Sequence, residues 1–162
     1  MNIELLKLLN RNARYTAEQL SAMLGITENE VKAQVAELEK EGIIGGYKAV
    51  VDWDRVNDGE VSAIIALNVV PKADLGFEEV AERIAKYPEV ESVSLMSGAY
   101  DYCVVIEGKT MKQVALFVAE KLATIENVMS TSTHFVLRKY KNNGVSFGMG
   151  DDDTADERGN IN

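Results

Sequence analysis

The feature that most constrains this chain is a pair of helix-start signals separated by a glycine. Thr16 is followed three residues later by Gln19, and Thr27 is followed by Glu30. Each pair matches a capping box, in which two side chains satisfy the free amides at a helix N-terminus. Gly25 lies between the pairs, where a helix end favours a residue that tolerates left-handed dihedral angles. The sequence therefore predicts two capped helices joined by a turn of only a few residues.

Apolar residues place a buried stripe on each of these helices and on one that precedes them. The stripes are Leu5, Leu6, Leu8 and Leu9; Ala17, Leu20, Met23 and Leu24; and Val31, Val35 and Leu38. Gly42 ends the third helix. Helices in this order with so short a turn are typical of a DNA-binding helix-turn-helix. A plain helical hairpin within a larger α fold is the alternative.

The region after these helices contains a predicted strand and a domain boundary. Residues 43–52 are rich in β-branched and aromatic side chains, which favours a strand. Residues 54–59 are polar and include Gly59, which is typical of a linker. We therefore assign residues 1–53 to a helix-turn-helix domain with its following strand, 54–59 to a linker, and 60–141 to a second domain.

The second domain alternates strand and helix patterns. The predicted strands cover residues 60–71, 90–96, 101–107 and 128–138. One predicted helix begins at Phe77 and stops before Pro88, and another follows a capping box at Thr110. A β-α-β-β-α-β order is that of the ferredoxin-like split unit, so the fold class is α+β.

The first strand of that domain is apolar on both sides. Val61, Ala63, Ile65, Leu67 and Val69 point one way, and Ile64, Ala66 and Val70 point the other. Two helices cover only one face of such a sheet, so the other face must meet another apolar surface. A second copy of the sheet is the simplest choice, which predicts a homodimer.

Composition narrows the class of protein further. Hydrophobic residues make up 46% and charged residues 27% of the 162 residues, and the net charge is −9. Residues 142–162 hold five acids and one arginine and are expected to form an acidic disordered tail. The lone Cys103 and the absence of a Cys/His cluster predict no disulfide and no metal site. With neither a signal peptide nor a membrane span in the sequence, we expect a cytoplasmic protein without a cofactor.

Residues 1–141 resemble the Lrp/AsnC family, also called feast/famine regulators. Three stretches carry the resemblance: the end of the helix-turn-helix, LEKEGIIGGYKAVVD; the loop SGAYDYCVV, similar to the Gly-x-x-Asp loop of the family; and the strand STSTHFVLRKYK. The resemblance implies a transcription regulator that binds double-stranded DNA and senses a small molecule, often an amino acid. It also implies a dimer that assembles further, to a tetramer or octamer.

Carried onto this sequence, the resemblance places DNA contacts on the third helix. The expected contact residues are Thr27, Asn29, Lys32, Ala33 and Gln34. Family members usually carry basic residues along this helix, but here Ala33, Gln34, Ala36 and Glu37 stand at the matching positions. Residues 28–41 hold five acids and two lysines. Because phosphate contacts dominate affinity for duplex DNA, we expect weak binding by a single module.

The effector site is expected around the loop that contains Asp101. The Asp101 carboxylate would take the ammonium of an amino acid, or it would only cap the turn. The backbone amides near Gly98 and Ala99 would take the effector carboxylate. The expected effector-binding residues are Leu95, Gly98, Ala99, Tyr100, Asp101, Met111, His134, Phe135 and Val136.

Two other functions compete with this interpretation. Sirohaem decarboxylases share a related fold, but they use histidines and basic residues, and this acidic chain has one histidine. Absorbance in the Soret region would reveal a bound tetrapyrrole. The second alternative is a sensing oligomer whose acidic helix-turn-helix binds a protein rather than DNA. A salt-dependent DNA-binding assay separates it from a DNA-binding regulator.

Overall fold

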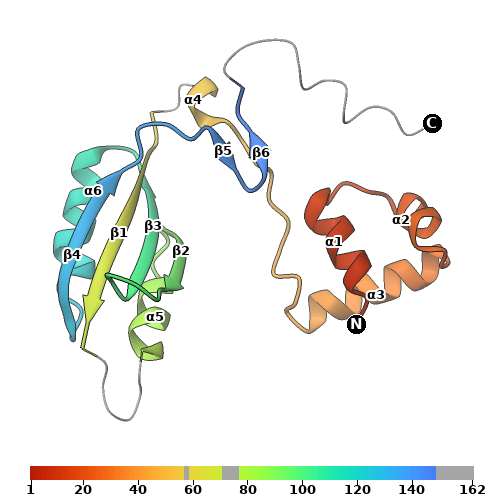
Figure 1. Cartoon of the computed structure of the whole chain (residues 1–162), viewed down its shortest axis with the longest axis horizontal. Helices are drawn as coiled ribbons and strands as arrows, with labels where there is room; N and C mark the ends of the chain where they lie inside the picture. The colour runs from red at the N-terminus through yellow and green to blue at the C-terminus, as the bar shows by residue number, and fades with distance from the viewer. Residues whose placement is uncertain (57–58, 71–76, 149–162) are drawn as a thin grey trace. The chain divides into compact units, whose positions relative to one another are not determined.

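The computed structural model describes residues 1–56, 59–70 and 77–148. The chain divides into two compact units, Met1–Ala49 and Val50–Asn162 (Figure 1). Each unit has its own cluster of buried apolar side chains.

The N-terminal unit contains three helices, α1 (Ile3–Arg11), α2 (Ala17–Leu24) and α3 (Glu28–Lys40). Both predicted capping boxes are present, at Thr16 and at Thr27, with reciprocal hydrogen bonds between side chains and backbone. Gly25 adopts φ 67°, so the turn between α2 and α3 needs the left-handed conformation that glycine permits. The stripes predicted from the sequence meet in a core of four buried residues: Leu5, Leu20, Val31 and Leu38.

The prediction of a strand at residues 43–52 is wrong. The amides of Ile43 and Ile44 both donate to the Leu38 carbonyl, at 3.0 and 3.1 Å, and these bonds close the end of α3. Residues 45–52 form no strand, and a short helix, α4 (Trp53–Val56), follows them. β-branched residues favour extended backbone, but a strand also needs a neighbour, and none pairs here among the described residues.

The C-terminal unit is built on a four-stranded antiparallel sheet. Its elements are β1 (Val61–Val69), α5 (Glu78–Ala85), β2 (Val90–Leu95), β3 (Tyr102–Gly108), α6 (Met111–Phe117), a π-helical turn η1 (Val118–Leu122) and β4 (Val128–Phe135). The strand order is β2-β3-β1-β4, which confirms the predicted ferredoxin-like arrangement. Figure 1 shows α5 and α6 beside the sheet.

The two helices and one face of the sheet enclose the larger core. Alternate residues of β1, including Ala63, Ile65 and Leu67, are fully buried and pack with Ile84 of α5 and Leu122 after α6. The intervening residues of β1 point to the opposite face, where Ile64 is 37% exposed. No described helix covers that face, so the sheet has one closed face and one open face.

A short hairpin corrects the predicted start of the disordered tail. Residues 142–148 belong to the ordered chain, where β5 (Lys141–Asn142) pairs with β6 (Val145–Ser146). Asn143 and Gly144 form the turn with φ 46° and 81°, as an Asn-Gly type I′ hairpin requires. Arg55 of α4 donates to the Gly148 carbonyl at 3.1 Å and holds the hairpin end. Residues 149–162 of the predicted tail lie outside the described residues.

Within the described residues, no helix combines the length and apolar character needed to cross a membrane. In the same part of the chain, no three His, Cys, Asp or Glu side chains come together as metal ligands.

Candidate nucleic-acid interface and ligand site

Helix α3 presents one exposed face opposite the core of the N-terminal unit. Val31 and Leu38 point inward and are 1% and 4% exposed. Asn29, Ala33 and Ala36 are exposed on the opposite side. The spacing of these three residues places them in one stripe along the helix. In DNA-binding helix-turn-helix units generally, the exposed side of the second helix is the one that enters a groove of DNA.

The predicted DNA-contact residues do not all share that surface. Thr27 is the N-cap of α3, and its hydroxyl is engaged with Glu30. Gln34 is half-buried and accepts a hydrogen bond at 2.9 Å from the Asn2 side chain, which also caps α1. Lys32 is exposed, and its ammonium lies 3.4 Å from the Glu28 carboxylate. Asn29 and Ala33 remain exposed without a partner among the described residues.

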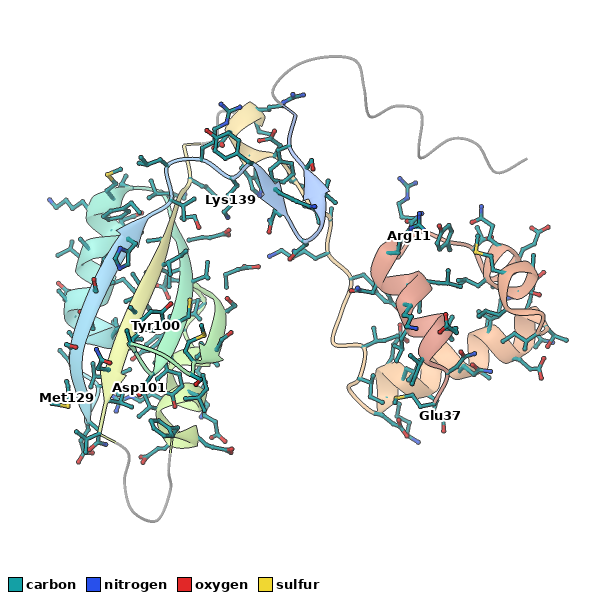
Figure 2. The ribbon with its side chains drawn as sticks, viewed as in Figure 1. Arg11, Glu37, Tyr100, Asp101, Met129 and Lys139 are labelled. Atoms are coloured by element: carbon teal, nitrogen blue, oxygen red, sulfur yellow. The ribbon has the colours of Figure 1, made fainter. Side chains whose placement is uncertain are left out.

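The acids of α3 differ in what they do. The backbone and hydroxyl of Thr27 hydrogen-bond the Glu30 carboxylate and lower its pKa, so this charge belongs to the helix cap. Glu37 carries no such role and is exposed in the last third of the helix (Figure 2). Arg11 and Arg14 are exposed elsewhere in the unit. Unit 1 holds seven acids and six bases in residues 1–49, so it carries almost no net charge.

Asp101 has a defined structural position in the sheet. One carboxylate oxygen of Asp101 accepts a hydrogen bond from the Val69 amide at 2.9 Å, and the Asp101 amide donates to the Leu67 carbonyl at 2.9 Å. The register of β1 against β4 shifts at Val69, which interrupts the ladder at the residue that the carboxylate serves. Asp101 therefore fastens its loop to the end of β1, through a partner 32 positions away rather than through an amide of its own turn.

The predicted effector residues fall into two groups at opposite ends of the sheet. Leu95 and loop residues 98–101 lie where β1 ends, since Leu95 and Leu67 both pair with Tyr102. The second group, Met111, His134, Phe135 and Val136, lies where β1 begins, since Phe135 pairs with Ala63. Ala63 and Leu67 are about 13 Å apart along the strand. Figure 2 shows Tyr100 and Asp101 near the end marked by Met129, away from Lys139. One chain does not join both groups.

The open face of the sheet has a small apolar centre and a polar rim. Ile64 pairs with Val105, and Ala66 pairs with Cys103, so these four side chains share the centre. The rim holds hydroxyl, amide and imidazole groups: Ser62, Asn68, Ser92, Ser94, Ser130, Ser132 and His134. Two of its hydrogen bonds are internal, from Asn68 to Ser130 at 3.1 Å and between Ser132 and His134 at 3.2 Å. Such a face can bury apolar area and still form hydrogen bonds across an interface.

Two structural roles had no counterpart in the sequence interpretation. Asn2 caps α1 and also holds Gln34, a pairing across 32 positions that no local pattern reveals. The Tyr102 side chain is 1% exposed and donates its hydroxyl hydrogen to the Phe77 carbonyl, which ties β3 to the start of α5. Burial raises the Tyr102 pKa above its usual value, and the charge of Asp101 adds to this effect.

Comparisons with known proteins match each of the two units to a known type of domain. A model of the Lrp/AsnC ligand binding domain matches residues 62–146, and a model of winged helix-turn-helix DNA-binding domains matches residues 2–44. The chain is 51% identical over 151 residues to the uncharacterized HTH-type transcriptional regulator YugG of Bacillus subtilis, covering 93% of this chain and 91% of that protein. It is 29% identical to the HTH-type transcriptional regulator Ptr1 of Methanocaldococcus jannaschii, covering 87% and 93%.

Solved structures show the same architecture. The transcriptional regulator NMB0573 of Neisseria meningitidis, solved as a complex with L-Met, superposes with a TM-score of 0.65 at 28% identity, covering 86% of this chain and 90% of that one. The leucine response regulatory protein LrpA of Mycobacterium tuberculosis superposes with a TM-score of 0.71 at 22% identity, covering 86% and 92%.

Proposed function

Since this chain belongs to the Lrp/AsnC family of transcription regulators, with a helix-turn-helix unit and a ligand-binding unit, we propose that it binds DNA as a homodimer in response to an amino acid. Helix α3 would enter the major groove, and the open sheet face would join the two copies. The observation that carries this proposal is the exposed stripe of α3 within a fully capped helix-turn-helix.

The N-terminal unit has few basic residues on α3, which limits the contacts that this helix can make with DNA phosphates. Lys32 is the only base in the first three turns of α3, and it is paired with Glu28. Phosphate contacts then fall to residues outside α3, such as Arg11 and Arg14. A single module supplies few such contacts, so stable binding needs modules linked by oligomerisation, which raises the local concentration of the second module.

The open face of the sheet supports the dimer. Its centre of Ile64, Ala66, Cys103 and Val105 is apolar, and its rim offers hydroxyl groups. Face-to-face packing would bury the centre and place the rim at the edge of the interface, where polar groups stay near water.

An amino acid would bind where the two separated groups of effector residues meet across a contact between copies. Asp101 is committed in part to Val69, so its remaining acceptor capacity would serve the ammonium. The exposed amides of residues 98–99 would serve the carboxylate, and the flexible Met111 would adapt to an apolar side chain. The NMB0573 structure holds L-Met, which gives the first ligand to test.

DNA binding is tested by fluorescence anisotropy with duplexes that carry one site or two sites spaced by whole helical turns. We expect weak binding to one site and cooperative binding to two. Glu37→Arg should tighten binding to unrelated sequences at low salt, with Glu37→Gln as the control that removes the charge alone. If no duplex binds and a protein partner does, the acidic helix-turn-helix is a protein-binding module instead.

The effector is tested by calorimetric titration with each of the twenty amino acids. Ala99→Glu should weaken binding because it places a carboxylate beside the one that the loop would receive, whereas Ala99→Gln should bind as wild type does. If none of the amino acids binds wild type below millimolar concentration, the effector belongs to another class of molecule.

A further inference from the structure

We infer that α3 reads A·T base pairs in the major groove through the Asn29 amide and through the methyl groups of Ala33 and Ala36. This inference rests on the proposed DNA binding and adds to it the class of base pair that is recognised.

The three residues have the geometry of a reading surface. Asn29, Ala33 and Ala36 are exposed in one stripe, opposite the buried Val31 and Leu38. At a rise of 1.5 Å per residue, the stripe is about 10 Å long. That length spans roughly three base pairs at 3.4 Å each, which matches the reach of a helix in the groove.

The polar groups that flank the first half of the stripe each have a partner within the unit. Thr27 and Glu30 bond each other in the capping box, and Gln34 is half-buried against Asn2. Lys32, which would otherwise donate to guanine, is paired with Glu28 at 3.4 Å. Asn29 is thus the one uncommitted amide on α3 among the described residues. Beyond it the stripe passes through Ala33 and Ala36 and reaches the exposed Lys40 only at the end of the helix.

The chemistry of this stripe matches adenine and thymine. A side-chain amide can form two hydrogen bonds with adenine, to N6 and N7, whereas guanine presents two acceptors that suit Arg or Lys. An alanine methyl group packs on the C5-methyl group of thymine, which cytosine lacks. Glu37 borders the stripe and can only accept hydrogen bonds, so cytosine N4 is the base group that it would favour.

The test begins with selection of bound sequences from a random duplex pool by the full-length chain. Thymines at the enriched positions are then replaced by deoxyuridine, which lacks only the methyl group. Each replacement in the reading region should weaken binding about fourfold, the effect expected for one buried methyl-sized group. Replacing adenine by 7-deazaadenine, which lacks the N7 acceptor, should weaken binding at the position that Asn29 reads.

Variants link these losses to named side chains. In Ala33→Ser and Ala36→Ser the methyl contact is lost, so one thymine position each should become insensitive to deoxyuridine. Ala22→Ser is the matched control, because Ala22 is also an exposed helical alanine but lies on α2. It should keep the full sensitivity to deoxyuridine.

The possible outcomes distinguish a failure of the A·T reading from a failure of the proposed DNA binding. If no sequence is enriched and no duplex binds, the proposed DNA binding itself fails. If duplexes bind but G·C pairs are enriched at the centre of each site, or deoxyuridine changes nothing, DNA binding stands and the A·T reading is overturned. Enrichment of A·T pairs with deoxyuridine effects that vanish in the Ala33 and Ala36 variants supports it.

Discussion

The two units of this chain differ in how completely each one buries its own apolar surface. The N-terminal unit buries four apolar residues among three helices, and its helix ends are capped by neighbours in the sequence. The C-terminal unit buries fourteen residues under α5 and α6 and leaves the opposite sheet face uncovered. The first unit is complete as a fold but weakly equipped to hold DNA, whereas the second is equipped to join copies. Under the proposed function, this difference implies that affinity for DNA comes from assembly of several copies.

The largest loss of stability is expected when one core side chain is truncated in each unit. Leu20→Ala and Ile106→Ala should each cost about 2–5 kcal/mol of unfolding free energy, because both side chains are almost fully buried. Leu20→Ala should unfold the small unit first and leave the sheet folded, which calorimetry would show as two separate transitions. Met23→Ala, on the same helix but 45% exposed, is the control. A single cooperative transition in the Leu20 variant would contradict the independence of the units.

Asp101→Ala should have the next largest effect, and only on the C-terminal unit. The Val69 amide would lose its acceptor at 2.9 Å, and an unsatisfied buried donor costs about 1–3 kcal/mol. Asp101→Asn keeps a side-chain oxygen in place and should lose less stability. Thermal denaturation of the two variants gives the comparison. A variant as stable as wild type that no longer responds to an amino acid would instead assign Asp101 to the effector alone.

Loss of a capping box should weaken the N-terminal unit by about 1 kcal/mol. In Thr27→Ala the Glu30 amide loses its acceptor and α3 frays at its start. Thr27→Ser retains the hydroxyl and is the control. Chemical denaturation followed by circular dichroism measures both, and equal midpoints for the two variants would show that the cap contributes nothing.

The smallest expected effects are on the pH dependence of stability, and they have opposite directions in the two units. The pKa of Glu30 is lowered in the folded state, so its contribution is present above the unfolded pKa and is lost as pH falls through the folded value, below about pH 4. The pKa of Tyr102 is raised, so its contribution is present below about pH 10 and is lost as pH rises further. Glu30→Gln and Tyr102→Phe should remove the acid-side and alkaline-side dependence respectively, in denaturation curves measured across pH.

The sequence predicted well those features that depend on near neighbours or on regular spacing. The capping boxes at Thr16 and Thr27 place each partner three residues away, and the stripe of Val31, Val35 and Leu38 follows from helix geometry alone. The order of strands and helices after residue 60 was predicted because alternating apolar residues mark strands independently of their partners.

Features that depend on distant partners leave no local signal in the sequence. Residues 43–52 have strand-like composition but no pairing strand, and Gln34 is held by Asn2 from another helix. The separation of Met111 from Asp101 follows from the strand register, which the sequence pattern does not specify. The hairpin at residues 141–146 is different, because its Asn-Gly turn is a local signal that the acidic composition of the tail obscured.

Assembly through the open face of the sheet is the step on which the proposed DNA binding depends most. Val105 lies half-buried at the centre of that face, so Val105→Arg would place two unpaired charges in the dimer interface. Ala85→Arg adds the same charge on the exposed side of α5 and is the control. Sedimentation and anisotropy on a two-site duplex should find Val105→Arg folded, monomeric and at least about a hundredfold weaker in DNA binding, with Ala85→Arg unchanged. A monomeric Val105→Arg that binds the duplex as tightly as wild type would contradict the account.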